Sequence, residues 1–292
     1  RQRKSDKSTS VNASGFDLSY ALVFGSNITL DGIPPLRTAR HDAEVVTQIL
    51  EQDYQYQIHL LTDSEATLDN ICQWLEHKLP TALETVESSR FLLYFAGHGI
   101  ALNGDDGPAG YLVPQDAKLV DVTTYLSLSR IYKALVGVPC RHLLGILDCC
   151  FAGAFRWSSH RKAILADLGT IHRERFNRFV RDAAWQMITS SAHDQTASDG
   201  FQLQAHRGKK GTHSPFATAL IDALSGSADA YPAAEPGKPA GDGVITATEL
   251  YLYLRDHVEL NTKDHALRQT PGIFLLGKHD KGEYIFLPPG HQ

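Results

Sequence analysis

The sequence predicts an α/β fold with a roughly six-stranded, mostly parallel sheet flanked by helices on both faces. Short, almost continuous apolar runs alternate with longer segments in which apolar residues recur every three or four positions. Buried parallel strands have the first pattern and amphipathic helices the second. The two most apolar runs, 90–97 and 142–148, each end in a Gly or an Asp that leads into a loop. Strands that alternate with helices in this way form a parallel sheet between two helical layers.

The first third of the chain supplies two strands and two helices. Strands are expected at 20–26 and 56–63, because both are short apolar runs that end in turn residues. The segment 38–52 between them carries a helical apolar stripe of Ala39, Ala43, Val46 and Leu50. A second helix is expected over 67–79, and Ser64 is a candidate N-cap for it.

The middle of the chain continues the alternation. After the strand at 90–97, GYLVP at 110–114 is typical of a short edge strand. The segment 127–137 predicts a helix that ends at Gly137, a residue favoured at helix C-termini. The strand at 142–148 follows, and AWQMITSS at 184–191 predicts a further core strand.

The last part of the chain has clear signals for where helices and loops begin. Ser214 and Pro215 stand in the cap-then-proline order that begins a helix. The stretch 227–243 is rich in Pro, Gly and Ala and predicts a loop, after which Thr246 begins another helix. A last strand is expected at 282–288.

Composition excludes several classes of protein. A formal net charge of -5 and a pI near 6.3 argue against nucleic acid or an anionic membrane as a partner. No apolar run is long enough to cross a bilayer. The four cysteines contain no CxxC pair, which argues against a zinc ribbon or a disulfide scaffold and indicates the reducing cytoplasm. We expect a flexible polar leader at 1–17, a single domain at 18–289, and further domains of the same polypeptide as partners.

Two reactive residue types follow the two strongest strands. His98 comes after the strand 90–97 and Cys150 after 142–148, so neighbouring parallel strands would bring them together. A thiol peptidase needs such a pair, because the imidazole generates the thiolate and later protonates the leaving amine. Alone, a histidine after a strand is usually a loop residue and a buried cysteine a small core residue. Their occurrence together at matching strand ends predicts a catalytic dyad, with the backbone N–H groups of Gly99 and Cys150 as the oxyanion hole.

Several segments carry a family resemblance. YFAGHG at 94–99 and DCCFAG at 148–153 resemble the histidine and cysteine motifs of metacaspases and related caspase-like peptidases of the C14 type. The segments at 34–43, 190–199 and 268–271 are similar to three further family segments, so the resemblance runs from about Tyr20 to Leu287. It implies the caspase-like fold and makes Cys150 the nucleophile, since Cys149 aligns with the family's serine. Three residues depart from the family pattern. Ala39, His41 and Ala96 occupy positions at which the family has a cysteine, an asparagine and a serine.

The resemblance also implies an acidic S1 pocket. Asp148 and Asp42 occupy the positions that bind Arg or Lys at P1 in metacaspases, and carboxylates are suited to a guanidinium or ammonium group. Each acid also has a purely structural alternative: Asp148 would be a turn residue at the end of a strand, and Asp42 an acid in the first turn of a helix, where the helix dipole stabilises it. Asp194 and Asp199 follow the strand at 184–191, where they line the pocket or bond the local backbone.

The expected function is therefore a cysteine endopeptidase that cleaves protein or peptide substrates after Arg or Lys. By resemblance, a large-subunit-like part extends to about 155, a linker to about 183 and a small-subunit-like part over 184–289. The basic residues of that linker are either self-processing sites or the solvated face of a helix.

Other functions fit the sequence less well. The alternative function is a weak or inactive caspase-like module for interaction or signalling, and an Asp- or Asn-directed peptidase would need a different pocket. No cofactor is required. The acidic run 103–108 is either a calcium site, as in some metacaspases, or a solvated loop, which its lack of the regular ligand spacing of a calcium loop favours. No GxGxxG, P-loop or HExxH motif is present.

Overall fold

The computed structural model describes residues 15–27, 32–33, 35–104, 107–149, 176–191, 212–262 and 269–289. Within these ranges a six-stranded sheet has the order β10-β8-β7-β3-β1-β2. Five strands are parallel, and β10 runs antiparallel beside β8. The strands are β1 (Leu18–Gly25), β2 (Gln57–Thr62), β3 (Ser89–Ala96), β7 (His142–Asp148), β8 (Ala184–Thr189) and β10 (Gly272–Leu275). The predicted mostly parallel sheet is confirmed.

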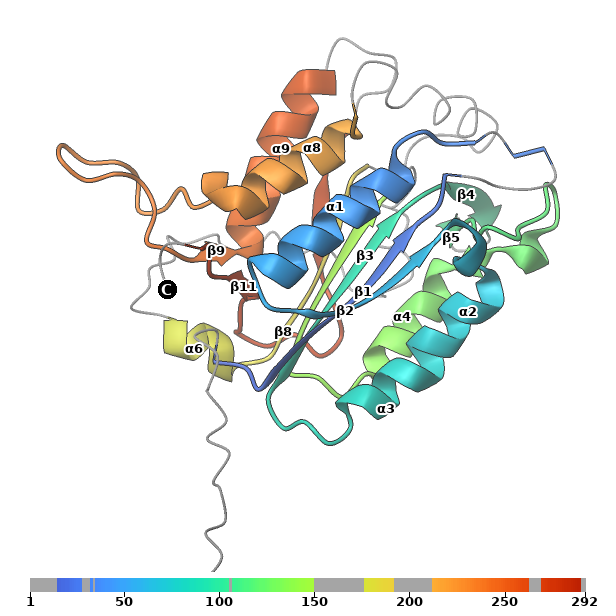
Figure 1. Ribbon diagram of the computed structural model, residues 1–292, viewed down its shortest axis with the longest axis horizontal. Coiled ribbons are helices and arrows are strands. Elements are labelled where there is room, and N and C mark those ends of the chain that lie inside the picture. The colour runs from blue at the N-terminus through green and yellow to red at the C-terminus, as the bar shows by residue number, and fades with distance from the viewer. Residues whose placement is uncertain are drawn as a thin grey trace, which may run out of the picture.

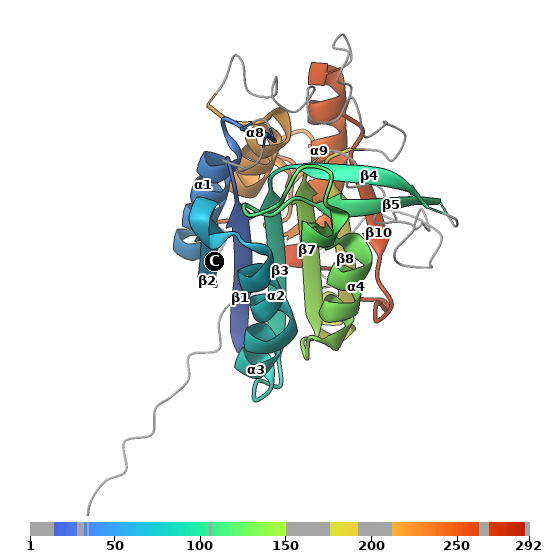
Figure 2. The same ribbon diagram turned by 90° about the vertical axis from the view of Figure 1, so that its right-hand side faces the viewer.

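Helices cover both faces of this sheet (Figures 1 and 2). One face carries α1 (Ala39–Gln52), α8 (Pro215–Asp222) with its π-helical extension η6 (Ala223–Ser227), and α9 (Ala247–Thr262). The other face carries α2 (Leu68–Gln73), η2 (Trp74–Lys78), α3 (Leu79–Leu83) and α4 (Leu128–Gly137). A shorter helix, α6 (Phe176–Arg181), precedes β8. Among the described helices none is long and apolar enough to cross a bilayer.

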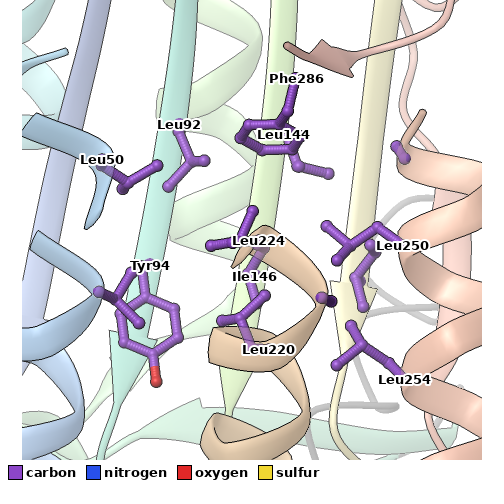
Figure 3. Packing of buried hydrophobic residues seen from close by; sticks show 14 of the residues in the cluster. Leu50, Leu92, Tyr94, Leu144, Ile146, Leu220, Leu224, Leu250, Leu254 and Phe286 are labelled. Atoms are coloured by element: carbon purple, nitrogen blue, oxygen red, sulfur yellow. The ribbon is translucent and has the colours of Figure 1, made fainter. Parts of the chain in front are cut away.

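The core explains why the central strands are almost continuously apolar. Side chains of β3 and β7 point alternately to the two helical layers, so each strand is buried on both faces. Leu92, Tyr94, Leu144 and Ile146 pack toward α1, α8 and α9, as Figure 3 shows. The intervening residues, such as Leu93 and Leu147, pack toward α2 and α4.

One predicted strand belongs to a different sheet. The segment 110–114 was expected at a sheet edge, but β5 (Gly107–Leu112) pairs with β4 (Gly99–Gly104) and β6 (Leu126–Ser127) in a separate antiparallel sheet. The chain leaves β3 and turns through Gly97 and His98 directly into β4. The candidate histidine is therefore held between two strands.

The last strand also differs from the prediction. The segment 282–288 contains β11 (Ile285–Phe286), which pairs with β9 (Ile245–Thr246) outside the main sheet. The sixth strand of the main sheet is β10 instead. It is four residues long and all of its residues are only partly buried, and the short apolar run at 273–276 was not predicted as a strand from the sequence.

The helix caps agree with the sequence at Ser214 but not at Ser64. Ser214 Oγ accepts a hydrogen bond from the N–H of Ala217 at 2.9 Å and caps α8 as predicted. Ser64 lies in the short 3-10 helix η1 (Asp63–Glu65), and Thr67 caps α2 through its hydroxyl oxygen. The predicted cap at Ser64 was wrong because a short turn separates it from the helix.

Candidate active site

The carboxyl ends of β3 and β7 lie side by side. Ala96 is the register partner of Asp148, and the N–H of Gly97 donates to the carbonyl oxygen of Asp148 at 3.3 Å. His98 follows directly and is 1% exposed, with its carbonyl oxygen accepting from the N–H of Val113 at 3.0 Å. The two motif-bearing strands are thus neighbours, as the sequence predicts. Cys150 itself lies outside the described residues.

The backbone just before Cys150 is fixed by two hydroxyl groups. Ser190 Oγ and Ser191 Oγ each donate a hydrogen bond to the carbonyl oxygen of Cys149 at 3.0 Å. The N–H of Ser190 also donates to the carbonyl oxygen of Leu147 at 2.9 Å, which extends the β7–β8 ladder. Sequence reasoning missed this role for the two serines. Their position immediately after a strand next to β7 is the signal that was available.

Cys149 is fully buried among apolar side chains. Its exposure is 0%, and it belongs to the core cluster on the α2 and α4 face that also contains Leu147. Asp148, the residue before it, points to the opposite side and contacts Ser214. This alternation assigns Cys149 to the core layer.

Two buried carboxylates meet at the start of α8. Asp42 from the first turn of α1 and Asp148 from the end of β7 are 1% and 3% exposed. Ser214 touches both, because its N–H donates to Asp42 Oδ2 at 3.3 Å and its Oγ donates to Asp148 Oδ2 at 2.6 Å. His213 donates from Nδ1 to Asp42 Oδ1 at 2.7 Å. The sequence predicted the two acids as neighbours but assigned neither His213 nor Ser214 to the pocket.

The acid pair forms part of the wall of a small pocket. Gly97 and Ser214 line it together with the segment from Leu36 to Ala39 and with Ala96. Ala39 and Ala96 stand where the resembling family has polar residues, so those two positions give the wall small apolar side chains. Burial, and then the charge of Asp148, raise the pKa of Asp42, while its hydrogen bonds to His213 and Ser214 lower it.

A comparison with protein families decides the assignment. The family model described as "Caspase domain", of peptidase C14, matches residues 18–276. The chain belongs to the caspase-domain family. This domain therefore belongs to a family of cysteine peptidases, and peptidases act on protein substrates.

Solved structures agree with the fold. The crystal structure of protein GSU0716 from Geobacter sulfurreducens, a structural genomics target, is similar with a TM-score of 0.54 and 15% sequence identity. The similarity covers 90% of this caspase domain chain and 95% of that one. No curated protein matches the chain in sequence.

Some predicted residues of the caspase domain lie outside the described part. Asp194 and Asp199 fall in 192–211, and most of the predicted linker falls in 150–175. Asp105, Asp106 and the side chains of the whole run 103–108 are likewise outside it. Of the predicted site, the structure therefore describes His98, Gly99, Asp42 and Asp148.

Proposed function

We propose that this caspase domain is a cysteine endopeptidase that cleaves after Arg or Lys, with Cys150 as nucleophile and His98 as base. The observation that carries the proposal is the buried pair of carboxylates, Asp42 and Asp148, in a pocket next to the loop of His98. Two acids in one small pocket repel each other, so a cation between them is a favourable occupant. A guanidinium group offers forked donors to such carboxylates.

The proposed reaction is an acyl transfer in two stages. His98 takes the proton of the Cys150 thiol, and the sulfur attacks the scissile carbonyl carbon. The carbonyl oxygen becomes an oxyanion that accepts hydrogen bonds from the N–H groups of Gly99 and Cys150. The C–N bond then breaks as His98 gives the proton to the leaving amine. Water, deprotonated by His98, hydrolyses the thioester and returns the thiol.

The burial of Cys149 supports the choice between the adjacent cysteines. A nucleophile must be reached by the substrate, whereas Cys149 packs in the apolar layer under α4. Its carbonyl oxygen, held by Ser190 and Ser191, supports a fixed geometry for the residue that follows.

Self-processing is part of the proposal for the linker. Its last stretch is the helix α6, in which Phe179 and Val180 are buried, so Arg178 and Arg181 stand on a packed helix. Folded helices are poor protease substrates unless they open locally. We therefore propose that any self-cleavage follows one of the earlier basic residues of the predicted linker. These are Arg156, Arg161, Lys162, Arg173 and Arg175.

A peptide panel that varies only P1 tests the proposal. Wild-type protein should cleave peptides with P1 Arg or Lys, while Cys150→Ala should not cleave any of them. His98→Ala should lower turnover by about 100- to 10,000-fold, which is the usual contribution of a general acid–base residue. Efficient cleavage after Asp, or turnover by purified Cys150→Ala, would contradict the proposal. A wild-type protein that cleaves no peptide of the panel would favour an inactive interaction module.

A further inference from the structure

The start of α8 touches both acids of the proposed P1 pocket. Ser214 donates its N–H to Asp42 and its hydroxyl to Asp148, and its Oγ also accepts the capping N–H of Ala217. One residue therefore fixes the relative position of two carboxylates that come from α1 and β7. Because Ser214 is the N-cap of a buried helix, its own position is set by the fold.

His213 holds Asp42 from its second oxygen. A carboxylate only accepts hydrogen bonds, so the ring nitrogen Nδ1 of His213 is the donor in the 2.7 Å contact with Asp42 Oδ1. The His213 ring stacks on that of His41, with centroids 4.7 Å apart and planes 11° apart. The stacking restrains the ring, so the donor is aimed at Asp42 before any substrate arrives.

We propose that His213 and Ser214 are positioning residues of the P1 pocket, which orient Asp42 and Asp148 through their hydrogen bonds. The proposal rests on the proposed function, because it assumes that the pocket receives a basic group. The positioning role goes beyond the proposed function, because it makes the placement and charge of the two acids depend on two residues that follow the predicted linker. Both residues are expected to act through the acids.

The charges around Asp42 make the expected direction clear. Burial and the carboxylate of Asp148 favour the neutral form of Asp42, and hydrogen bonds from His213, then Ser214 and Thr38, oppose them. Among the described residues, the other charged or titratable groups near this site are Arg37, which lines the pocket, His41, which stacks on His213, and His98, which follows the pocket residue Gly97. Loss of the His213 donor should raise the pKa of Asp42, so that the pocket loses negative charge at a higher pH.

Agmatine, a free alkyl guanidinium compound, tests the pocket without any turnover. Its binding to the whole chain, followed by NMR between pH 4 and 8, should weaken on the acid side as Asp42 gains a proton. We expect His213→Leu to move the midpoint of that loss upward by about one pH unit, since a donor to a charged group is removed. His213→Asn keeps a donor near the position of Nδ1 and should restore the wild-type midpoint.

Ser214 needs a control for its capping role. Ser214→Ala removes a helix cap and the hydroxyl contact to Asp148, while the backbone N–H contact to Asp42 remains. Ser127→Ala removes an equivalent cap on α4, on the other face of the sheet. Both should lower stability through the lost cap, but only Ser214→Ala should weaken agmatine binding, by about tenfold. The ratio of kcat/KM for a P1 Arg peptide to that for the matched peptide with citrulline, the neutral isostere of Arg, should fall in Ser214→Ala to the same extent.

The outcomes separate the two proposals. Agmatine binding with wild-type affinity and midpoint in His213→Leu and Ser214→Ala would overturn the positioning role and leave the basic P1 pocket standing. A wild-type protein that neither binds agmatine nor prefers P1 Arg to citrulline would overturn both. Loss of turnover in a variant that still binds agmatine normally would also count against the positioning role.

Discussion

Gly97 N–H donates to the carbonyl oxygen of Asp148, so the segment that carries His98 and the segment that leads to Cys150 are joined directly. The bond lies one step beyond the last register pair of β3 and β7, Ala96 and Asp148. Asp148 thus uses its backbone to join the two loops and its side chain to contact Ser214. Changes at its carboxylate can therefore be made without removing the loop contact.

The two acids should differ in their effect on P1 selection. Asp148→Asn should remove most of a preference for P1 Arg that we expect to exceed ~100-fold, because an unpaired buried charge costs several kcal/mol. Asp42→Asn should remove a smaller part, since Asp42 is held by His213 and Ser214. The measurement is kcat/KM for matched P1 Arg and P1 citrulline peptides. An unchanged preference in Asp148→Asn would rule out the acidic pocket.

Cys149 should behave as a core residue. Cys149→Ala should cost about 1 kcal/mol of folding stability for the lost sulfur and leave most turnover intact. Iodoacetamide should label Cys150 in the native protein, while burial raises the pKa of the Cys140 thiol to about 12 and keeps it unreactive. Mass spectrometry of labelled peptides checks this assignment. Native labelling at Cys149, or abolished turnover in a folded Cys149→Ala protein, would reverse it.

The two serines after β8 should act as a pair. Either hydroxyl alone still satisfies the carbonyl oxygen of Cys149, so Ser190→Ala and Ser191→Ala should each have a small effect on kcat. The double variant removes both donors from that buried carbonyl oxygen. Its fold-decrease in kcat should therefore exceed the product of the fold-decreases of the two single variants. A double-mutant cycle on kcat and on the free energy of unfolding measures the coupling. Strict additivity would argue against a shared contact.

Gly25 sets the approach of α1 to β1. A Cβ at this position would lie 2.4 Å from Ala43 Cβ and 2.8 Å from the carbonyl oxygen of Ala39, so α1 would have to shift. Gly25→Ala should destabilise the fold by about 1–3 kcal/mol and weaken binding in the pocket, because α1 carries Asp42. Gly137→Ala in α4 meets no atom within 4 Å and serves as the control. Urea unfolding of both variants checks the contrast, and equal stabilities would show that α1 yields easily.

Glu249 should give the folding stability a pH dependence. Burial raises the pKa of Glu249 to about 7, although Thr246 donates two hydrogen bonds to its carboxylate. A raised pKa in the folded state means that the contribution to stability is fully present below about pH 4.5 and is lost as pH rises through about 7. Glu249→Gln should remove up to about 3 kcal/mol of the stability difference between pH 5 and pH 8.

Urea titrations at the two pH values measure that difference. The exposed residue Glu51 on α1 provides the control, since Glu51→Gln changes the net charge equally. If Glu249→Gln and Glu51→Gln lose stability between the two pH values to the same extent, burial of Glu249 is not the cause.

Local pattern made the central sheet predictable. The strands β3 and β7 are apolar on both faces, which identified them and the reactive residues beyond their ends. The strand β4 and its pairing with β5 were missed because β4 has no long apolar run, and β10 was missed because it is short and only partly buried. Pairing partners of such strands depend on tertiary contacts that no local pattern encodes.

The residues that contact the two acids of the pocket were not predicted, for a related reason. His213 and Ser214 stand 171 and 172 positions from Asp42, the residue that they bond. Sequence spacing identified Ser214 correctly as a helix cap, but the contacts of its side chain with other elements depend on how α8 docks against α1 and β7. Motif resemblance supplied the two acids, and only the packing of the folded chain supplied their partners.

The bridge made by Ser214 also makes the pocket a junction between two stretches of polypeptide. Asp42 and Asp148 precede the predicted linker, whereas His213 and Ser214 follow it, so a single backbone break between them would leave the pocket shared by two fragments. Those fragments would remain joined through six register pairs between β7 and β8 in the middle of the sheet. A nicked molecule would therefore keep its pocket only while the fragments stay associated, and dissociation of the fragments would separate the acids from the residues that orient them.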